Sequence, residues 1–160
     1  RYRALAALVA AGRGEEWVAS MTGENTPAGS EKYAFMTLAA RPDAETKANY
    51  FAAYLQPDDP PEQWMQDSLG NFHWRGQTEL TLPYLRQALD QVEWVKTHRK
   101  IFFMPAWIDA FVNGHSSPEA LEIVDGFLNE RADLPQDIRM KILQSADSLR
   151  RAVKIRRRWG

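Results

Sequence analysis

The sequence contains no cysteine. This absence excludes disulfides, thiolate zinc sites and cysteine nucleophiles, and it is typical of proteins in a reducing compartment. The longest apolar stretch runs from Ala4 to Ala11, which is too short to span a bilayer and lacks a signal-peptide cleavage pattern. We therefore expect a cytoplasmic protein that has no membrane partner.

The common hydrolase motifs are also missing. Zinc hydrolysis needs imidazoles on one helix face, hence the H-E-x-x-H spacing, but none of His73, His98 and His115 lies four residues from another. There is no G-x-S-x-G elbow for a serine nucleophile. We predict that this chain has no catalytic residue, metal site or cofactor, and we interpret the histidines as surface or capping residues.

Positive and negative charges nearly balance, with 20 Lys and Arg against 21 Asp and Glu. A net charge of −1 argues against attraction of the whole surface to nucleic acid or to an anionic membrane. The exception is a basic run from Arg150 to Arg158. Because no nucleic-acid motif accompanies it, we interpret this run as a solvated helix end and do not expect nucleic acid as a partner. Contact with RNA or DNA through this run stays open as an alternative.

Apolar residues recur at helical spacing along most of the chain, interrupted by glycine and proline. Ser30, Asp43 and Asp59 are predicted helix caps, and the Ser116-Ser117-Pro118-Glu119 sequence predicts a capping box. A long helix is predicted from Leu80 to His98. The segment from Ile101 to Val112 is apolar nearly all round, which predicts a buried helix that includes Phe102.

No segment alternates with a period of two, so no strand is predicted. We expect an all-α fold of about nine helices, in which stacked antiparallel pairs form a HEAT- or armadillo-like superhelix. A chain of 160 residues fits a single domain, 1–160. The chain opens on Arg1 within a helical pattern and without an initiator Met, so we read it as a fragment of a larger chain.

The candidate binding residues are His98, Arg99 and Lys100, which precede the apolar helix. Arginine offers a fork of donors that matches a carboxylate, so these positions are candidates for contact with a peptide carboxylate. The alternative is that they are cations placed at the C-terminal end of a helix, where the helix dipole favours positive charge. Both readings stay open at this point.

Several segments, taken in order, resemble the C-terminal helical domain of bacterial aminopeptidase N, a family of zinc metallopeptidases. They are residues 26–32 (TPAGSEK), 39–47 (AARPDAETK), 82–85 (LPYL), 117–121 (SPEAL), 134–139 (LPQDIR) and 148–156 (SLRRAVKIR). Each segment alone is weakly specific, but their order before an Arg-rich terminal helix is more so. The resemblance covers most of the chain.

The resemblance implies a division of labour within a longer enzyme. In the family, an upstream domain holds zinc in H-E-x-x-H plus a distant Glu, and a G-x-M-E-N loop binds the amino terminus of the substrate. Neither motif occurs here, and Gly23-Glu24-Asn25 only echoes the end of the loop. The resemblance therefore implies a non-catalytic domain whose partners are the upstream catalytic domain and peptides. It would cap the active site of an enzyme that removes N-terminal residues from peptides. The alternative is a helical-repeat module that binds protein or nucleic acid.

Overall fold

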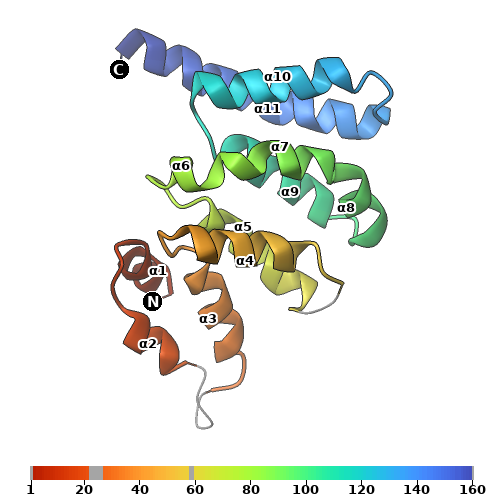
Figure 1. Cartoon of the computed structure of the whole chain (residues 1–160). Helices are drawn as coiled ribbons and strands as arrows, with labels where there is room; N and C mark the ends of the chain where they lie inside the picture. The colour runs from red at the N-terminus through yellow and green to blue at the C-terminus, as the bar shows by residue number, and fades with distance from the viewer. Residues whose placement is uncertain (1, 22–26, 58–59, 160) are drawn as a thin grey trace. The chain divides into compact units, whose positions relative to one another are not determined.

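The computed structural model describes residues 2–21, 27–57 and 60–159. Every regular element in these ranges is a helix, α1 to α11, which confirms the all-α class (Figure 1). None of the described helices is long and apolar enough to cross a membrane. Contacts divide the chain into two compact units, unit 1 (residues 1–80) and unit 2 (residues 81–160), which we describe separately. The single domain over 1–160 and the superhelix stay predictions.

Unit 1 contains five helices and most of a short sixth, which ends one residue past the boundary of the unit. Their bounds are α1 Tyr2–Ala10, α2 Glu15–Ala19, α3 Ser30–Leu38, α4 Ala44–Tyr54, α5 Glu62–Phe72 and α6 Thr78–Thr81. Helix α3 packs against α1, α2 and α5, and α4 packs against α5.

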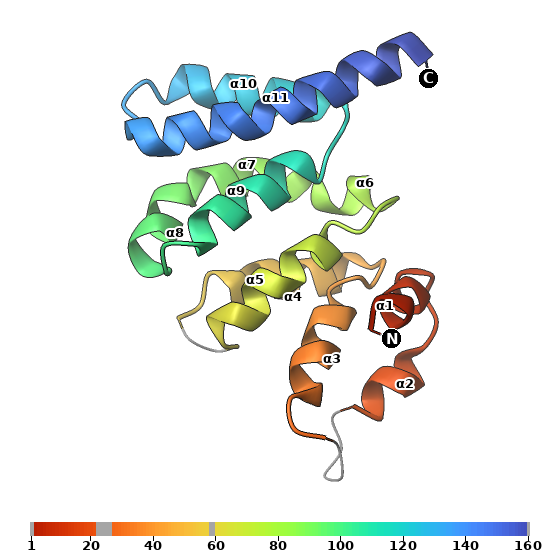
Figure 2. The ribbon, with the colours of Figure 1, turned by 180° about the vertical axis from the view of Figure 1, so that it is seen from behind.

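Unit 2 is built around α9, which packs against α7, α8 and α11. Its helices are α7 Pro83–Asp90, α8 Val92–His98, α9 Phe103–Asn113, α10 Pro118–Glu130 and α11 Gln136–Trp159. Helices α10 and α11 lie side by side in both views, and the C-terminal turns of α11 extend beyond α10 (Figures 1 and 2).

The predicted caps are partly confirmed. The Asp43 side chain accepts from the Thr46 backbone N–H at 2.7 Å and caps α4. The prediction for Ser30 is wrong, because Gly29 precedes the helix in a left-handed conformation (φ 85°) that glycine tolerates, and Ser30 is the first helical residue. Asp59 lies outside the described residues, as do Gly23, Glu24 and Asn25.

The capping box predicted for the Ser116-Ser117-Pro118-Glu119 sequence is also corrected. Ser117, rather than Ser116, is the N-cap of α10, and its hydroxyl accepts from the Ala120 N–H at 3.2 Å. Glu119 is therefore the second residue of the helix, one position too early to reach back in a capping box.

The prediction of one continuous helix from Leu80 to His98 is wrong. The structure has α6, α7 and α8 in its place, because α7 begins at Pro83 and ends at Asp90, and Gln91 separates it from α8. Apolar periodicity continues through such one-residue breaks, so the pattern alone does not reveal them.

The buried apolar helix is confirmed as α9, with a later start than predicted. Phe103, Trp107 and Phe111 are each at most 1% exposed, and the Trp107 indole N–H donates to the Ala88 carbonyl of α7 at 2.9 Å. Ile101 and Phe102, predicted as part of the same buried helix, instead precede it and are 80% and 76% exposed.

Candidate functional site

The three candidate binding residues lie in a short turn between α8 and α9, which we call the 98–102 turn. Helix α8 ends at His98, Arg99 has extended backbone angles, and α9 begins at Phe103. The turn therefore presents residues 98–102 at one end of the helix pair, and it brings the three predicted residues together.

Arg99 is 8% exposed and lies between two aromatic rings. Its guanidinium carbon is 5.6 Å from the centroid of the Trp94 ring and 5.4 Å from that of Phe103. Cation–π contacts of this kind hold a guanidinium against ring faces and favour a fixed orientation. Arg99 thus joins α8 to α9, and its proposed contact with a carboxylate stays a prediction.

His98 is exposed, and its ring stacks on Trp94, which is one of the two rings that flank Arg99. Its ring lies 4.6 Å from the Trp94 ring, with an interplanar angle of 12°. The Nδ1 atom is 2.9 Å from both the Trp94 carbonyl oxygen and the Thr97 hydroxyl. Nδ1 is therefore engaged by the helix end, and the solvent-facing part of the ring is held in one position.

The remaining three residues of the turn have exposed side chains, of which one is cationic and two are apolar. Lys100 supplies a cation, and Ile101 and Phe102 supply apolar surface. Ile101 and Phe102 are adjacent, and contiguous exposed apolar surface often marks an interaction site. A cation beside two apolar side chains can receive the carboxylate and a nearby apolar side chain of a peptide.

Sequence reasoning missed Ile101 and Phe102 as surface residues. Their apolar character continues into α9, so the periodicity assigned them to the buried helix. The available signal was Pro105, because proline is favoured in the first turn of a helix, and its position would have moved the start of the helix past Phe102.

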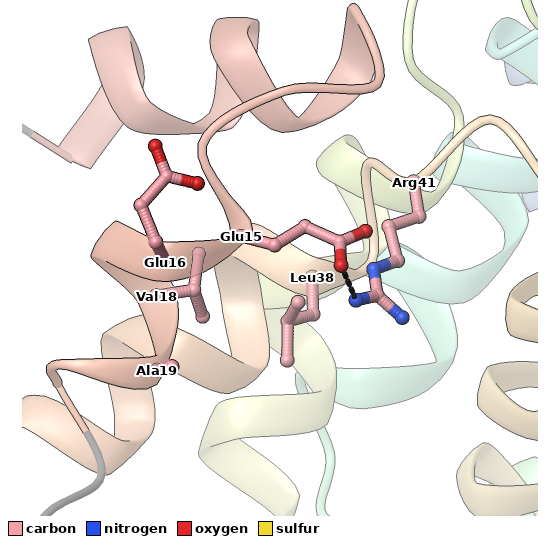
Figure 3. Close-up of a pocket in the computed structure, with 6 residues that line it drawn as sticks. All are labelled: Glu15, Glu16, Val18, Ala19, Leu38 and Arg41. Carbon is pink, nitrogen blue, oxygen red and sulfur yellow. Dashed lines mark ion pairs between the residues drawn. The ribbon is translucent and has the colours of Figure 1, made fainter.

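A second candidate is a pocket of about 360 Å³ in unit 1 (Figure 3). An ion pair closes one side, with Arg41 Nη2 2.8 Å from Glu15 Oε2, while the Glu16 carboxylate points away from Arg41 (Figure 3). The buried Nε of Arg41 has no hydrogen-bond partner among the described residues. Val18 and Leu38 form the apolar lining. The Glu15 side chain is 60% exposed, so the ion pair is a surface one and contributes little to stability.

The neighbouring segment, residues 39–47, ties together the helices of unit 1. Lys47 is fully buried, and its Nζ donates to the carbonyls of Ala39 at 2.7 Å and Phe72 at 2.9 Å, which end α3 and α5. Burial lowers the pKa of Lys47 to about 8, with Asp43 acting in the opposite direction. Lys47, which lies in one of the segments that carry the family resemblance, is thus explained by packing.

His73 and His115 are not part of the 98–102 turn and have different surroundings. His73 makes an edge contact with the Phe72 ring, at 4.9 Å between centroids. His115 is 3% exposed, so of the two interpretations, surface or capping residue, the surface one is wrong for it, and its burial lowers its pKa to about 4. No group of three or more His, Asp or Glu within the part of the chain that the structure describes could hold a metal ion.

The model of one protein family matches the chain, and its description is "ERAP1-like C-terminal domain". The match covers residues 1–151. The comparison with curated proteins gives no match. Because the family match covers nearly the whole chain, and because the described helices agree with the all-α expectation, this chain belongs to the ERAP1-like C-terminal domain family, an aminopeptidase-associated domain.

Proposed function

We propose that this chain is the non-catalytic C-terminal domain of a zinc-dependent aminopeptidase, and that it caps the active site of an upstream catalytic domain and gates the access of peptides. The observation that carries the proposal is the family match over residues 1–151. The zinc and the residues that bind it would lie in the upstream domain, together with the chemistry of peptide cleavage.

The 98–102 turn is the surface that best suits contact with a peptide. In the proposed role, the Lys100 ammonium and the exposed edge of His98 receive the peptide carboxylate, while Ile101 and Phe102 contact an apolar side chain near it. Arg99 acts through its neighbours, since its guanidinium lies against Trp94 and Phe103. Enclosure of the site would exclude water and select substrates by size.

The first test is to read the coding sequence upstream of Arg1. The proposal expects G-x-M-E-N followed by H-E-x-x-H and a further Glu on a later helix, the signature of a gluzincin. An upstream sequence without these motifs would remove the proposal and leave the alternative, a helical-repeat module that binds protein or nucleic acid.

The second test measures the role of the turn in the full-length enzyme. Lys100→Ala should raise the KM of peptides long enough to reach the turn and leave kcat and the hydrolysis of an aminoacyl arylamide unchanged. Lys96→Ala, which removes a cation of the same unit from its ion pair with Asp137, is the matched control. Equal effects of the two variants would contradict the proposed contact of Lys100 with the peptide carboxylate.

A further inference from the structure

The last turns of α11 differ from the rest of unit 2 in what they expose. After Val153, which is 3% exposed, residues 154–159 are all exposed. In both views this end of α11 projects past α10 (Figures 1 and 2). We call residues 151–159 the α11 tip. The family match ends at Arg151, so nearly all of the tip lies beyond it.

The α11 tip carries five cations and no carboxylate. The cations are Arg151, Lys154, Arg156, Arg157 and Arg158. None of them forms an ion pair with another described residue, whereas the preceding Arg150 pairs with Asp125 at 2.5 Å and with Asp147 at 3.4 Å. The basic charge of the tip is therefore available to an external anion, although the net charge of the whole chain is −1.

Two large apolar side chains share one side of the tip. Ile155 is 61% exposed and Trp159 is 77% exposed, and a spacing of four residues places them one above the other on a helix. At about 100° per residue, Arg156 lies on one side of this pair and Arg151 and Arg158 on the other, each within about 80°. The Arg158 guanidinium carbon is 5.3 Å from the centroid of the Trp159 ring.

This apolar pair faces away from the core of unit 2. The buried residues of α11 nearest the tip are Leu149 and Val153, and the same rotation per residue places them about 100° and 140° around the helix from the centre of the pair. A flat surface can therefore reach Ile155 and Trp159 without displacing the rest of the unit. Arg157 lies opposite the pair and would stay in water.

We propose that the α11 tip binds the surface of an anionic lipid bilayer. An exposed apolar pair flanked on both sides by arginine is the arrangement of helices that lie in a membrane interface, where Trp and Ile enter the boundary and the cations contact lipid phosphates. A nucleic-acid backbone would use the cations but would leave Ile155 in water. This proposal revises the expectation of no membrane partner, which rested on the short apolar stretches and on a net charge of −1 that averages over the local charge of the tip.

The test measures sedimentation of the 160-residue chain with vesicles of phosphatidylcholine alone or mixed with phosphatidylglycerol. Binding should require the anionic lipid and should weaken as salt is added. The triple variant Arg151→Gln/Arg156→Gln/Arg158→Gln should lose about fivefold in partitioning for each cation removed. Its control removes three exposed cations elsewhere, with Arg3→Gln/Arg13→Gln/Arg75→Gln, and should bind as the original chain does.

A second pair of variants tests the apolar contribution. Trp159→Ser should weaken vesicle binding severalfold, whereas Trp17→Ser, which removes a tryptophan that is 63% exposed in unit 1, should not. Because the chain has no cysteine, Ile155→Cys and Arg157→Cys can each carry one environment-sensitive fluorophore. Vesicles should shift the emission of the label at position 155 to the blue and leave the label at 157 unchanged.

Three results would overturn the proposal. The first is an absence of binding to the anionic vesicles, and the second is binding that the tip variants leave unchanged. The third is tip-dependent binding of a labelled DNA or RNA duplex by a chain that does not bind the vesicles, which would identify a nucleic-acid site instead. Circular dichroism confirms that each variant keeps its helices.

Discussion

The helices of the two units are joined by different balances of buried polar and apolar contact, although unit 1 also has an apolar cluster around Val9 and Val18 and unit 2 also has the buried Trp107–Ala88 hydrogen bond. In unit 1, buried polar groups join the helices: Lys47 binds the ends of α3 and α5, the buried Gln77 amide donates to the Ala40 carbonyl at 2.8 Å, and the hydroxyls of Tyr54 and Ser68 are 2.7 Å apart. In unit 2, the rings of Trp107 and Phe111 lie 4.4 Å apart in an apolar core.

The ion pairs of unit 2 lie at the surface, as does the Arg41–Glu15 pair of unit 1. Arg131 pairs with Glu93 and Asp133, Arg86 pairs with Glu130, and all these side chains are partly exposed. Apolar burial has no direction and tolerates adjustment, whereas a buried donor or acceptor needs its partner at one place. Unit 1 should therefore be specified by a few directional contacts, and unit 2 by the volume of its core.

The largest expected effect comes from emptying part of the core of unit 2. Phe111→Ala should lower the free energy of unfolding by about 3–5 kcal/mol, through lost burial and the cavity left behind. Hydrogen exchange read by mass spectrometry should show faster exchange in α7, α9 and α11, and little change in α3 and α5. Faster exchange in both units to the same extent would show that they unfold as one.

Lys47→Met tests the polar contacts of unit 1. It keeps most of the buried volume but leaves the carbonyls of Ala39 and Phe72 without their shared donor. The expected loss is about 2–3 kcal/mol, measured by urea unfolding. Lys141→Met, at a partly exposed lysine of α11, is the matched control and should change stability by less than about 0.5 kcal/mol. Equal stability of the Lys47→Met variant would mean that those carbonyls find water.

Acid should weaken unit 2 through His115. Burial lowers the pKa of His115 to about 4, below its ordinary 6.5, so the folded state binds fewer protons than the unfolded state between these values. Its contribution to stability is therefore complete above about pH 6.5 and is lost as pH falls toward 4, by at most about 3 kcal/mol. Urea unfolding of His115→Gln should show a smaller slope with pH across this window. Identical slopes in the two chains would contradict this role.

The smallest effects are expected from the removal of two helix caps, one in each unit. Asp43→Ala and Ser117→Ala each remove a side chain that accepts from a backbone N–H, at 2.7 Å in unit 1 and 3.2 Å in unit 2. Each should cost about 1 kcal/mol. The Asp43→Ala substitution should cost more, because the Asp43 carboxylate also accepts from the Thr46 hydroxyl at 2.8 Å. A larger loss for Ser117 in thermal unfolding would reverse the ranking.

Some of this fold was accessible from the sequence because local chemistry fixes it. The Asp43 cap and the apolar helix α9 follow from residues within one or two turns. The division of Leu80–His98 into three helices and the exposure of Phe102 were missed, since both depend on where helices end. The contacts of Lys47 with Phe72, 25 residues apart, leave no local pattern.

The candidate site was also predicted only in part. His98, Arg99 and Lys100 do lie in one exposed turn, as their adjacency requires. The hypothesis of carboxylate contact rested on the donors of arginine, whereas Arg99 is buried between two rings and the other two residues are exposed. Burial is decided by Trp94 and Phe103 on the two flanking helices, and it could not be read from the three residues themselves.

The most direct test of the proposed gating role uses the full-length enzyme and a series of peptides that share an N-terminal residue and differ in length. Ile101→Ser/Phe102→Ser should lower kcat/KM for the longer peptides by about tenfold and leave an aminoacyl arylamide unaffected, since two exposed apolar contacts are lost. Met140→Ser, at a methionine that is 58% exposed on α11, is the control. An unchanged length preference in the double variant would contradict the account.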